Sequence, residues 1–365
     1  MSKKIKIMHI INNFQVGGAE KMLVLLLNNL AQRPDIEIYV VSLEGHGHLI
    51  NELSDKIIVK EFKYNLFRPK FNRFDPNFRF DLLRYVMKIK PNIIHGHLFK
   101  GEDFAKVLGA ITKTPVITTS HDTLVWPGRK NKFFNKYLSK AVAVSDIVAK
   151  HLKLAYGIDN KRIQIIPNAI DTKLFENGKK TFNITKPVFL YIGRLLKSKG
   201  IDDAIKGLSK LKSDYPQMKF LIYGKEVHKE YKEYLNKLVK DNKYDFVQFM
   251  GRTDDVPAAL KTGDIFVLSS QTEGFAISVL EAAAASKPVI ATNVGAINIL
   301  VKNGQSGIFV DWNNPNQIYN AAKKILDENL VEKYGAEALK IANSQFDIAR
   351  IEQMYYDLYT GVLND

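Results

Sequence analysis

Short runs of β-branched and other apolar residues alternate with amphipathic helical segments along the chain, and this alternation restricts the folds that the chain can adopt. In the first half, the runs cover Ile5–Ile11, Ile36–Leu43, Asn92–Gly96 and Pro115–Thr119. In the second half, they cover Pro187–Gly193, Met218–Gly224, Phe246–Met250, Asp264–Ser270 and Pro288–Thr292. Such runs are typical of strands buried in a parallel sheet with helices on both faces. The sequence therefore predicts an α/β chain with two doubly wound, Rossmann-like domains that face each other across a cleft.

The domain boundary is predicted from length and local composition. A chain of 365 residues is too long for one ordinary hydrophobic core, which favours two domains. The polar stretch Asp171–Lys186 separates the two sets of strands and is the predicted linker, with the boundary near Lys180. The expected domains are residues 1–180 and 181–345. Residues 346–365 carry apolar side chains at helical spacing, so we expect a helix that packs as core or straps the domains together.

The charge of the chain is concentrated in its first half. Residues 1–180 hold 30 Lys and Arg against 16 Asp and Glu, whereas the remainder holds 23 against 22. This excess favours an anionic partner, either a phospholipid surface or nucleic acid, although a general solubilising bias would give the same count. The chain has no cysteine, no apolar run near 18 residues and no leader sequence, so we expect a cytoplasmic protein.

The segment Glu273–Ser286 carries the strongest functional signal. It follows a predicted strand and opens a helix, so the backbone N–H groups of Gly274 and Phe275 are expected to face a ligand. Glu281 lies among apolar residues, beside Leu280, and a buried carboxylate there requires a polar partner such as a ribose diol. The alternative is an exposed Glu281, with Glu273 capping the helix.

Two further loops follow predicted strands. In Gly193–Gly200, the guanidinium of Arg194 and the ammonium of Lys199 are suited to neutralising a departing diphosphate, although such residues also occur as plain surface charge. In the first half, Gly17 and Gly18 permit a close backbone approach to a ligand at a helix N-terminus, or they form a tight turn.

Histidines follow two strands of the first half. We expect His97 and His121 to line the cleft, whereas His9 and His95 lie within apolar runs and are interpreted as core residues. A metal site built from His95, His97 and His121 is an alternative that no strong ligand spacing supports. The sequence contains no Asp-x-Asp, which disfavours a metal-bridged diphosphate. We therefore predict that the protein needs neither a metal nor a bound cofactor.

Together these motifs resemble the family-4 retaining glycosyltransferases of the GT-B fold. The resemblance covers essentially the whole chain. It is carried by GGAE at residues 17–20, PNAID at 167–171, GRLLKSKG at 193–200, GR at 251–252 and EGFAISVLEA at 273–282. The most specific element is the Glu-x7-Glu spacing from Glu273 to Glu281. Two departures from the family pattern are Ala276, where Gly is frequent, and the sequence KEV after Gly224.

The resemblance implies roles for individual residues. Arg194 and Lys199 would hold the donor diphosphate, Glu281 the ribose, and Glu273 the donor sugar together with the amides of Gly274 and Phe275. The base would bind near Lys225 and Gly251–Arg252. The donor would be a nucleotide diphosphate sugar, with UDP expected, and the transferred group a hexosyl or N-acetylhexosaminyl unit. The acceptor would be a glycan or a lipid-linked glycan of bacterial polysaccharide or glycolipid synthesis, held by the first domain.

The implied mechanism needs no enzyme nucleophile. The diphosphate leaves into a cationic field, its own oxygen takes the acceptor proton, and attack on the same face retains the anomeric configuration. His97 and His121 would position or polarise the substrates. An inverting reaction would instead need a base, for which Asp122 and His121 are the candidates. A nucleotide-sugar epimerase or hydrolase on the same fold is a second hypothesis, and a nucleic-acid-binding protein, which lacks any recognisable motif here, is a third.

A basic and aromatic segment predicts where the protein works. Lys56–Lys90 interleaves ten Lys and Arg residues with eight Phe and Tyr residues, and Trp126–Tyr137 has a similar character. Such a pattern fits an anionic membrane surface, or else a domain core with a solvated rim. We expect peripheral association with the inner face of the plasma membrane, with Arg68, Lys70 and Arg73 among the contacts.

Overall fold

The computed structural model describes residues 4–15, 17–62, 76–121, 132–175 and 182–364, and the chain divides into two compact units. The first unit joins Met1–Ala169 to Ile348–Asp365, and the second is the continuous stretch Ile170–Asp347. The chain therefore leaves the first unit once and returns to it at the end. The predicted boundary near Lys180 lies outside the described residues, and the residues that begin the predicted linker belong to the second unit.

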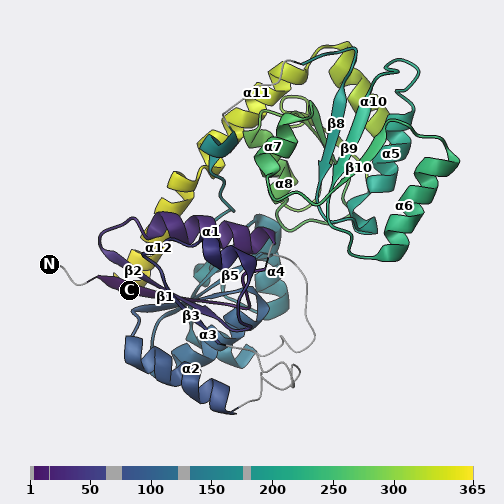
Figure 1. Ribbon diagram of the computed structural model, residues 1–365. Coiled ribbons are helices and arrows are strands. Elements are labelled where there is room, and N and C mark those ends of the chain that lie inside the picture. The colour runs from purple at the N-terminus through teal and green to yellow at the C-terminus, as the bar shows by residue number, and fades with distance from the viewer. Residues whose placement is uncertain (1–3, 16, 63–75, 122–131, 176–181, 365) are drawn as a thin grey trace. The chain divides into compact units, whose positions relative to one another are not determined.

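Seven parallel strands form the sheet of the first unit, in the order β3-β2-β1-β4-β5-β6-β7. The strands are β1 (Ile5–Ile11), β2 (Ile36–Ser42), β3 (Ile58–Glu61), β4 (Ile93–His97), β5 (Val116–Ser120), β6 (Leu138–Ala143) and β7 (Ile163–Ile165). The α-helices are α1 (Gly18–Leu30), α2 (Pro76–Ile89), α3 (Leu98–Thr112), α4 (Asp146–Tyr156) and α12 (Ile348–Asn364), with 3₁₀ turns at His48–Glu52, Lys132–Tyr137 and Asn160–Arg162. Helices α1 and α12 cover one face of the sheet, and α2 and α3 cover the other (Figure 1).

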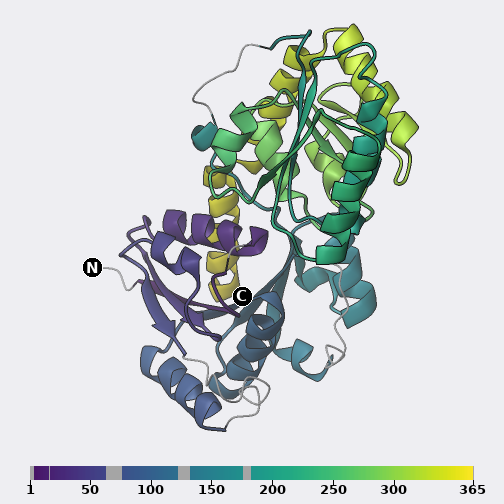
Figure 2. The same cartoon turned by 45° about the vertical axis from the view of Figure 1, so that its right-hand side comes forward.

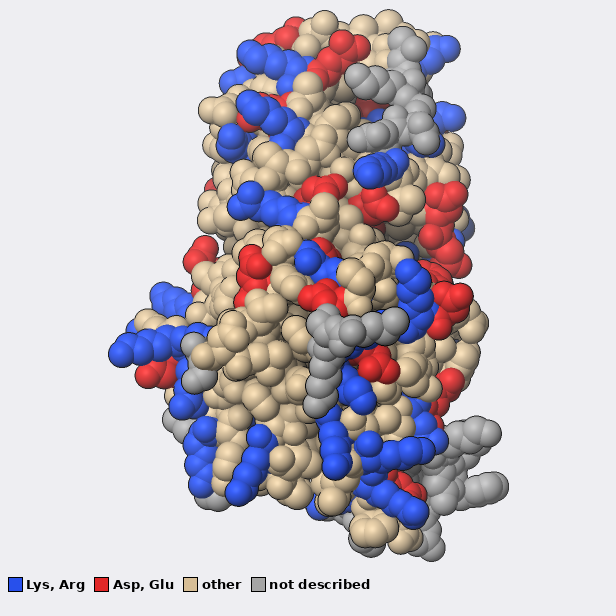
Figure 3. Space-filling view, turned by 90° about the vertical axis from the view of Figure 1, so that its left-hand side faces the viewer, with Lys and Arg blue, Asp and Glu red and all other residues tan. Residues whose placement is uncertain are grey.

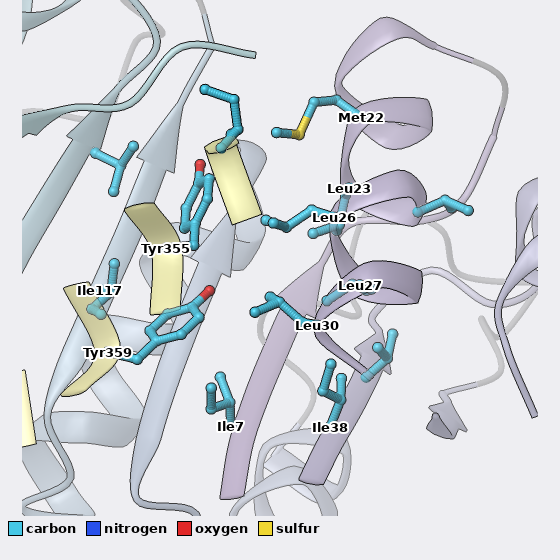
Figure 4. Packing of buried hydrophobic residues seen from close by; sticks show 14 of the residues in the cluster. Ile7, Met22, Leu23, Leu26, Leu27, Leu30, Ile38, Ile117, Tyr355 and Tyr359 are labelled. Carbon is cyan, nitrogen blue, oxygen red and sulfur yellow. The ribbon is translucent and has the colours of Figure 1, made fainter. Parts of the chain in front are cut away.

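The core of the first unit lies between its sheet and the pair α1 and α12. Leucines of α1 and two tyrosines of α12, Tyr355 and Tyr359, point toward the apolar side chains of β1, β2 and β5 (Figure 4). Helix α12 lies beside α1 in both ribbon views (Figure 1 and Figure 2). A bidentate ion pair from Arg33 to Glu352, with N···O distances of 2.5 and 3.0 Å, fixes α12 at the edge of this core. The predicted C-terminal helix is therefore a structural part of the first unit.

Six parallel strands form the sheet of the second unit, in the order β10-β9-β8-β11-β12-β13. The strands are β8 (Val188–Ile192), β9 (Lys219–Tyr223), β10 (Val247–Gly251), β11 (Ile265–Leu268), β12 (Val289–Thr292) and β13 (Gly307–Val310). The α-helices are α5 (Ile201–Ser209), α6 (Lys229–Asp241), α7 (Val256–Lys261), α8 (Ile277–Ala284), α9 (Ile297–Leu300), α10 (Pro315–Asp327) and α11 (Val331–Ile341). Short 3₁₀ turns span Thr172–Phe175 and Lys197–Lys199, and a π-helical turn spans Ala342–Phe346. Helices α5, α6 and α10 cover one face, and α7, α8 and α11 cover the other (Figure 1).

The predicted α/β class with two doubly wound parallel sheets is confirmed. The strands that the apolar runs predicted are all present, because strands buried between helix layers consist almost wholly of apolar residues. The prediction missed β3, β6, β7 and β13, which are short or lie at or near a sheet edge. Across the described part of the chain, the helices all fall short of the length or the apolarity that crossing a membrane requires.

Candidate functional site

The second sheet has a switch point between β8 and β11. From β8 the chain proceeds through β9 to β10 on one side, and from β11 it proceeds through β12 to β13 on the other. Loops that leave neighbouring parallel strands in opposite directions open a crevice at the carboxyl ends of those strands, where ligands bind in sheets of this kind. The loops that follow β8 and β11 carry Arg194, Lys199 and Glu273.

The loop after β8 is held by its own strand and by the neighbouring loop. Burial, and then the nearby carboxylate of Glu273, raise the pKa of Tyr191, so its hydroxyl stays protonated. This hydroxyl donates a hydrogen bond of 2.8 Å to the carbonyl of Arg194. Gly200 has a φ of +66°, and a Cβ there would lie 2.1 Å from the carbonyl oxygen of Ser269. Only glycine fits this position, and it brings Lys199 next to the loop that follows β11.

Glu273 joins the two loops through its side chain. Its Oε1 accepts hydrogen bonds from Lys199 Nζ at 2.6 Å and from Ser270 Oγ at 2.7 Å. The side chains of Lys199 and Glu273 are only 17% and 11% exposed, so the pair is partly shielded from water and its electrostatic attraction is strengthened. The arrangement fixes an ammonium and a carboxylate at the switch point, while Arg194 is exposed beside them.

Helix α8 differs in one respect from each of the two interpretations of its sequence, the buried Glu281 and the alternative with a capping Glu273. Glu281 is only half-buried, because the residues of α8 that face the core are its neighbours Val279 and Leu280, each 0% exposed. Glu273 does not cap the helix: the N-cap residue is Ala276, and it makes no side-chain capping bond. A half-exposed Glu281 remains accessible to a ligand, and the completely buried Leu280 supports the helix from inside.

The loop between β11 and α8 packs against two other segments of the second unit. Phe275 is 8% exposed and its ring meets that of Phe346 edge-on, at a centroid distance of 6.0 Å. A Cβ at Gly295, whose φ is +61°, would lie 2.1 Å from the carbonyl oxygen of Glu273, so the loop after β12 also packs against this loop. Gly274, in the loop between β11 and α8, is half-buried.

Lys225 and Arg252 are exposed on the loops that follow β9 and β10. The backbone N–H of Leu195 donates to the carbonyl of Lys225 at 3.0 Å, and that of Gly224 donates to Gly251 at 2.8 Å. Arg252 also forms an ion pair with Asp254 at 2.5 Å. Hydrogen bonds therefore tie the loops after β8, β9 and β10 together along one edge of the sheet.

Three histidines of the first unit form a buried stack at the ends of β1 and β4. His9 Nδ1 and His97 Nε2 are hydrogen-bonded at 2.9 Å, and the rings of His95 and His97 lie 4.1 Å apart. His95 is hydrogen-bonded to the hydroxyls of Tyr359 and Thr119, both at 2.8 Å. Burial lowers the pKa of His9 to about 3 and the pKa values of His95 and His97 well below 6.5. These residues are neutral at physiological pH.

The stack changes the predicted role of His97. His97 is 2% exposed, so it belongs to the interior with His9 and His95 and cannot touch a ligand directly. Ring nitrogens of the three histidines lie within 4.8 Å of one another, a distance that a metal ion could bridge. In the structure, however, the nitrogens of His95 and the facing nitrogens of His9 and His97 are engaged in hydrogen bonds. The structure thus groups His9 with His95 and His97, in place of the predicted set with His121.

The other predicted residues of the first unit lie after β1 and β5, which flank β4 in the sheet. His121 follows β5, and burial lowers its pKa to about 4. Gly17 is the N-cap of α1, and Gly18 is its first residue. Asp122, Arg68, Lys70, Arg73 and Trp126 fall outside the described residues. Sequence analysis did not identify Tyr191 or Ser270 as functional, although Ser270 ends the predicted strand run Asp264–Ser270 and precedes Glu273 by three residues.

Comparison with known proteins gives the same interpretation for both units. Residues 16–174 match the model described as Glycosyltransferase Family 4, and residues 173–341 match the model described as Glycosyl transferases group 1. Among curated proteins, an uncharacterised glycosyltransferase of Methanocaldococcus jannaschii is 26% identical over 94% of this chain and 95% of its own length. An Escherichia coli UDP-Gal:alpha-D-GlcNAc-diphosphoundecaprenol alpha-1,3-galactosyltransferase is 23% identical over 77% of this chain and 78% of its own length.

A solved structure shows the same fold. Anabaena HepE, crystallised with UDP and glucose, superimposes with a TM-score of 0.81 at 20% identity, covering 98% of this chain and 100% of HepE. The two family models follow each other along the chain and together cover residues 16–341. This chain therefore belongs to the glycosyltransferases of the GT-B fold, with a family 4 domain followed by a group 1 domain.

Proposed function

We propose that this glycosyltransferase transfers a hexosyl or N-acetylhexosaminyl unit from a UDP-sugar to an acceptor with retention of configuration. The observation that carries the proposal is the partly buried network of Lys199, Glu273 and Ser270 at the switch point of the second sheet. In this proposal, the Lys199 ammonium neutralises the leaving diphosphate, and the neighbouring Glu273 carboxylate accepts hydrogen bonds from hydroxyls of the donor sugar. The UDP and glucose bound to HepE support this donor class.

Each part of the donor has a proposed partner in the second unit. The diphosphate binds Arg194 and Lys199, whose ammonium has three donors and can serve the phosphate and Glu273 at the same time. Glu281 accepts from the ribose hydroxyls, and the base lies along the tied loops of Lys225 and Arg252. In this proposal, side-chain cations supply the charge neutralisation, and no metal is needed.

The chemical step follows from this arrangement. Glu273 and the amides of Gly274 and Phe275 hold the donor sugar, while Arg194 and Lys199 stabilise charge that develops on the diphosphate as the anomeric C–O bond breaks. The acceptor oxygen attacks from the side of the departing group, and its proton passes to a phosphate oxygen, which gives retention.

The first unit is the proposed acceptor unit. We propose that His121, after β5, contacts or orients the acceptor, whereas the buried His97 supports this strand end from within. The lipid-linked acceptor in the name of the E. coli relative supports a glycan or lipid-linked acceptor of polysaccharide or glycolipid synthesis. Under the second hypothesis, an epimerase or hydrolase, the protein would convert the nucleotide sugar when no acceptor glycan is present.

A product analysis tests these proposals together. Screening UDP-sugars by thermal shift identifies the donor, because a bound ligand raises the unfolding temperature by mass action. Proton NMR of the product from an α-linked donor should then show an α-linkage that forms only when acceptor is present. A β-linkage would contradict retention, and UDP release at the same rate without acceptor would favour a hydrolase.

Glu281→Ala tests the ribose contact. Loss of a hydrogen bond to a charged group should weaken donor binding by about 1.5–3 kcal/mol, or roughly 10- to 150-fold, without changing the melting temperature of the free protein. Glu233→Ala is the matched control, because Glu233 is an exposed helical carboxylate of the same unit. Wild-type affinity in Glu281→Ala would remove Glu281 from the site.

We also propose that the first unit works at the inner face of the plasma membrane. On α2, Phe80 and Met87 are 65% and 59% exposed, and the exposed Arg84 lies between them at helical spacing. Exposed apolar side chains flanked by cations suit the interface of an anionic bilayer. Lys and Arg side chains also gather over the first unit in Figure 3.

Vesicle sedimentation tests this surface. Binding to vesicles with anionic lipid should weaken as salt rises, and the double variant Phe80→Ser, Met87→Ser should reduce it further. Leu154→Ser on α4 is the matched control, because Leu154 is 68% exposed in the same unit. If the wild type stays in solution with anionic vesicles at low salt, the acceptor unit is not a membrane-binding unit.

A further inference from the structure

A cavity of about 290 Å³ lies at the carboxyl ends of β12 and β13 in the second unit. Residues that end or follow these two strands form its walls, among them Thr292, Asn293, Val294, Phe309, Asp311 and Trp312. The carboxyl edge of a parallel sheet is where ligands bind, yet this cavity shares no lining residue with the loops assigned to the donor.

The chemistry of the walls suits a neutral, hydroxyl-rich ligand. Trp312 and Phe309 offer half-buried aromatic rings, and Asn293 and Asp311 are exposed polar side chains. The walls, all made of described residues, contain no Lys or Arg that would favour a phosphate. Apolar C–H faces of pyranose rings pack on aromatic rings, while carboxylates and carboxamides bind their hydroxyls.

Asp311 is held in a fixed orientation. Its backbone N–H donates to Gln317 Oε1 at 2.7 Å, and Gln317 Nε2 donates to Asp311 Oδ2, also at 2.7 Å. Gln317 is itself positioned at the start of α10, where its backbone N–H donates to Asn314 Oδ1 at 3.2 Å. Among the described residues, Asp311 Oδ1 has no hydrogen-bond partner, so this oxygen is available to a ligand hydroxyl.

The cavity is connected to the Glu273 network. Thr292, in its wall, donates from Oγ1 to the carbonyl of Ser270 at 2.6 Å, and Ser270 Oγ donates to Glu273. The wall continues from Val294 to Gly295, which packs against the carbonyl of Glu273. Two hydrogen bonds therefore connect the wall residue Thr292 to Glu273, the proposed donor-sugar contact.

We propose that this cavity binds one neutral saccharide unit, with its ring against Trp312 and its hydroxyls on Asp311 and Asn293. This saccharide would be a part of the acceptor or product glycan other than the part that the first unit holds, and it would not be the donor sugar. Only the assignment of this saccharide to the acceptor or product glycan rests on the proposed function. Saccharide binding in the cavity itself can be tested with simple glycosides.

The two tryptophans of the chain, Trp126 and Trp312, make a direct test available. Protein labelled with 5-fluorotryptophan should give two fluorine resonances, and the one that disappears in Trp312→Phe belongs to Trp312. Methyl α-D-glucopyranoside and methyl N-acetyl-α-D-glucosaminide are titrated separately from UDP and UDP-glucose. We expect at least one methyl glycoside to shift the Trp312 resonance in a saturable way, and UDP to leave it unchanged.

Two variants sharpen the result. Asp311→Ala should weaken glycoside binding at least about tenfold, and Asp241→Asn, an exposed carboxylate on α6, should not change it. No shift with either glycoside at up to about 50 mM, where a millimolar site would saturate, overturns the proposal. A shift with UDP-glucose alone also overturns it, because the cavity would then hold the donor sugar. UDP binding, measured by thermal shift on the same samples, tests the proposed function separately.

Discussion

The switch points of the two sheets carry opposite kinds of side chain. At the first, between β1 and β4, His9 and His97 are buried and neutral, and His9 Nδ1 bonds directly to His97 Nε2. At the second, between β8 and β11, the ammonium of Lys199 and the carboxylate of Glu273 form a partly shielded ion pair. The same strand connectivity therefore supports a hydrogen-bonded interior in one unit and a charged pair of loops in the other.

The physical reason lies in where the polar residues fall relative to the strand ends. His9 and His95 lie within strands and His97 is the last residue of one, so all three are enclosed by the helix layers. Lys199 and Glu273 lie several residues beyond β8 and β11, on loops that return toward the strand ends. A short distance along the chain thus separates a buried residue within a strand from a charged residue on the loop that follows it.

The largest effect in this comparison should come from Lys199→Ala. Removing a cation that stabilises developing charge should lower kcat about 100- to 1,000-fold, or about 2.7–4 kcal/mol. Lys197→Ala is the matched control, because Lys197 is exposed in the same 3₁₀ turn. Steady-state kinetics with the identified donor would measure both. Equal activity in the two variants would mean that the second switch point is not the site of diphosphate departure.

Acidification should affect the first unit more than the second. Below pH 6.5, the unfolded chain binds a proton at His9, whereas the folded chain does not until the pH approaches 3. The stability supplied by neutral His9 is therefore complete above pH 6.5 and is lost progressively as the pH falls from 6.5 to 3. At pH 5, the loss is about 2 kcal/mol for this residue alone.

Pulsed hydrogen exchange of the backbone amides in β1 and β8, read by mass spectrometry, would follow the first and the second unit during urea unfolding. The urea midpoint of β1 should fall between pH 7 and pH 5 by more than the midpoint of β8. Parallel shifts of both midpoints would show that the histidine stack does not set the acid sensitivity of the first unit.

A smaller effect is expected from Ser270→Ala. Ser270 acts through Glu273, so its loss should lower kcat about fivefold, equivalent to about 1 kcal/mol, with little change in donor affinity. Ser270→Thr keeps the hydroxyl and should restore most of the rate. A change in KM alone would contradict a positioning role, and failure of the threonine variant to restore the rate would point to packing instead.

Sequence patterns predicted the architecture because buried parallel strands leave a continuous apolar signature. They also located the loops of Lys199 and Glu273, since these follow two of the predicted strands. The patterns did not predict that Glu281 is half-exposed, because the apolar residues around it define a helix without saying which side faces the core. They also missed Ser270, which accepts a hydrogen bond from Thr292 at the end of β12, and Trp312, which lines a cavity with the residues after β12. Both contacts join segments that are separated in the sequence.

The first unit is completed only by the last helix of the chain. Helix α12 contributes Ile351, Tyr355 and Tyr359 to its core, each at most 1% exposed, and Tyr359 also bonds His95. During synthesis, the ribosome makes the whole second unit before α12 emerges, which takes roughly ten to forty seconds at about 5–20 residues per second. During that interval, the apolar side chains of β1 and α1 that α12 will cover stay exposed to solvent, while the continuous second unit can already fold. The core of the first unit can therefore be completed only after the whole second unit has been synthesised.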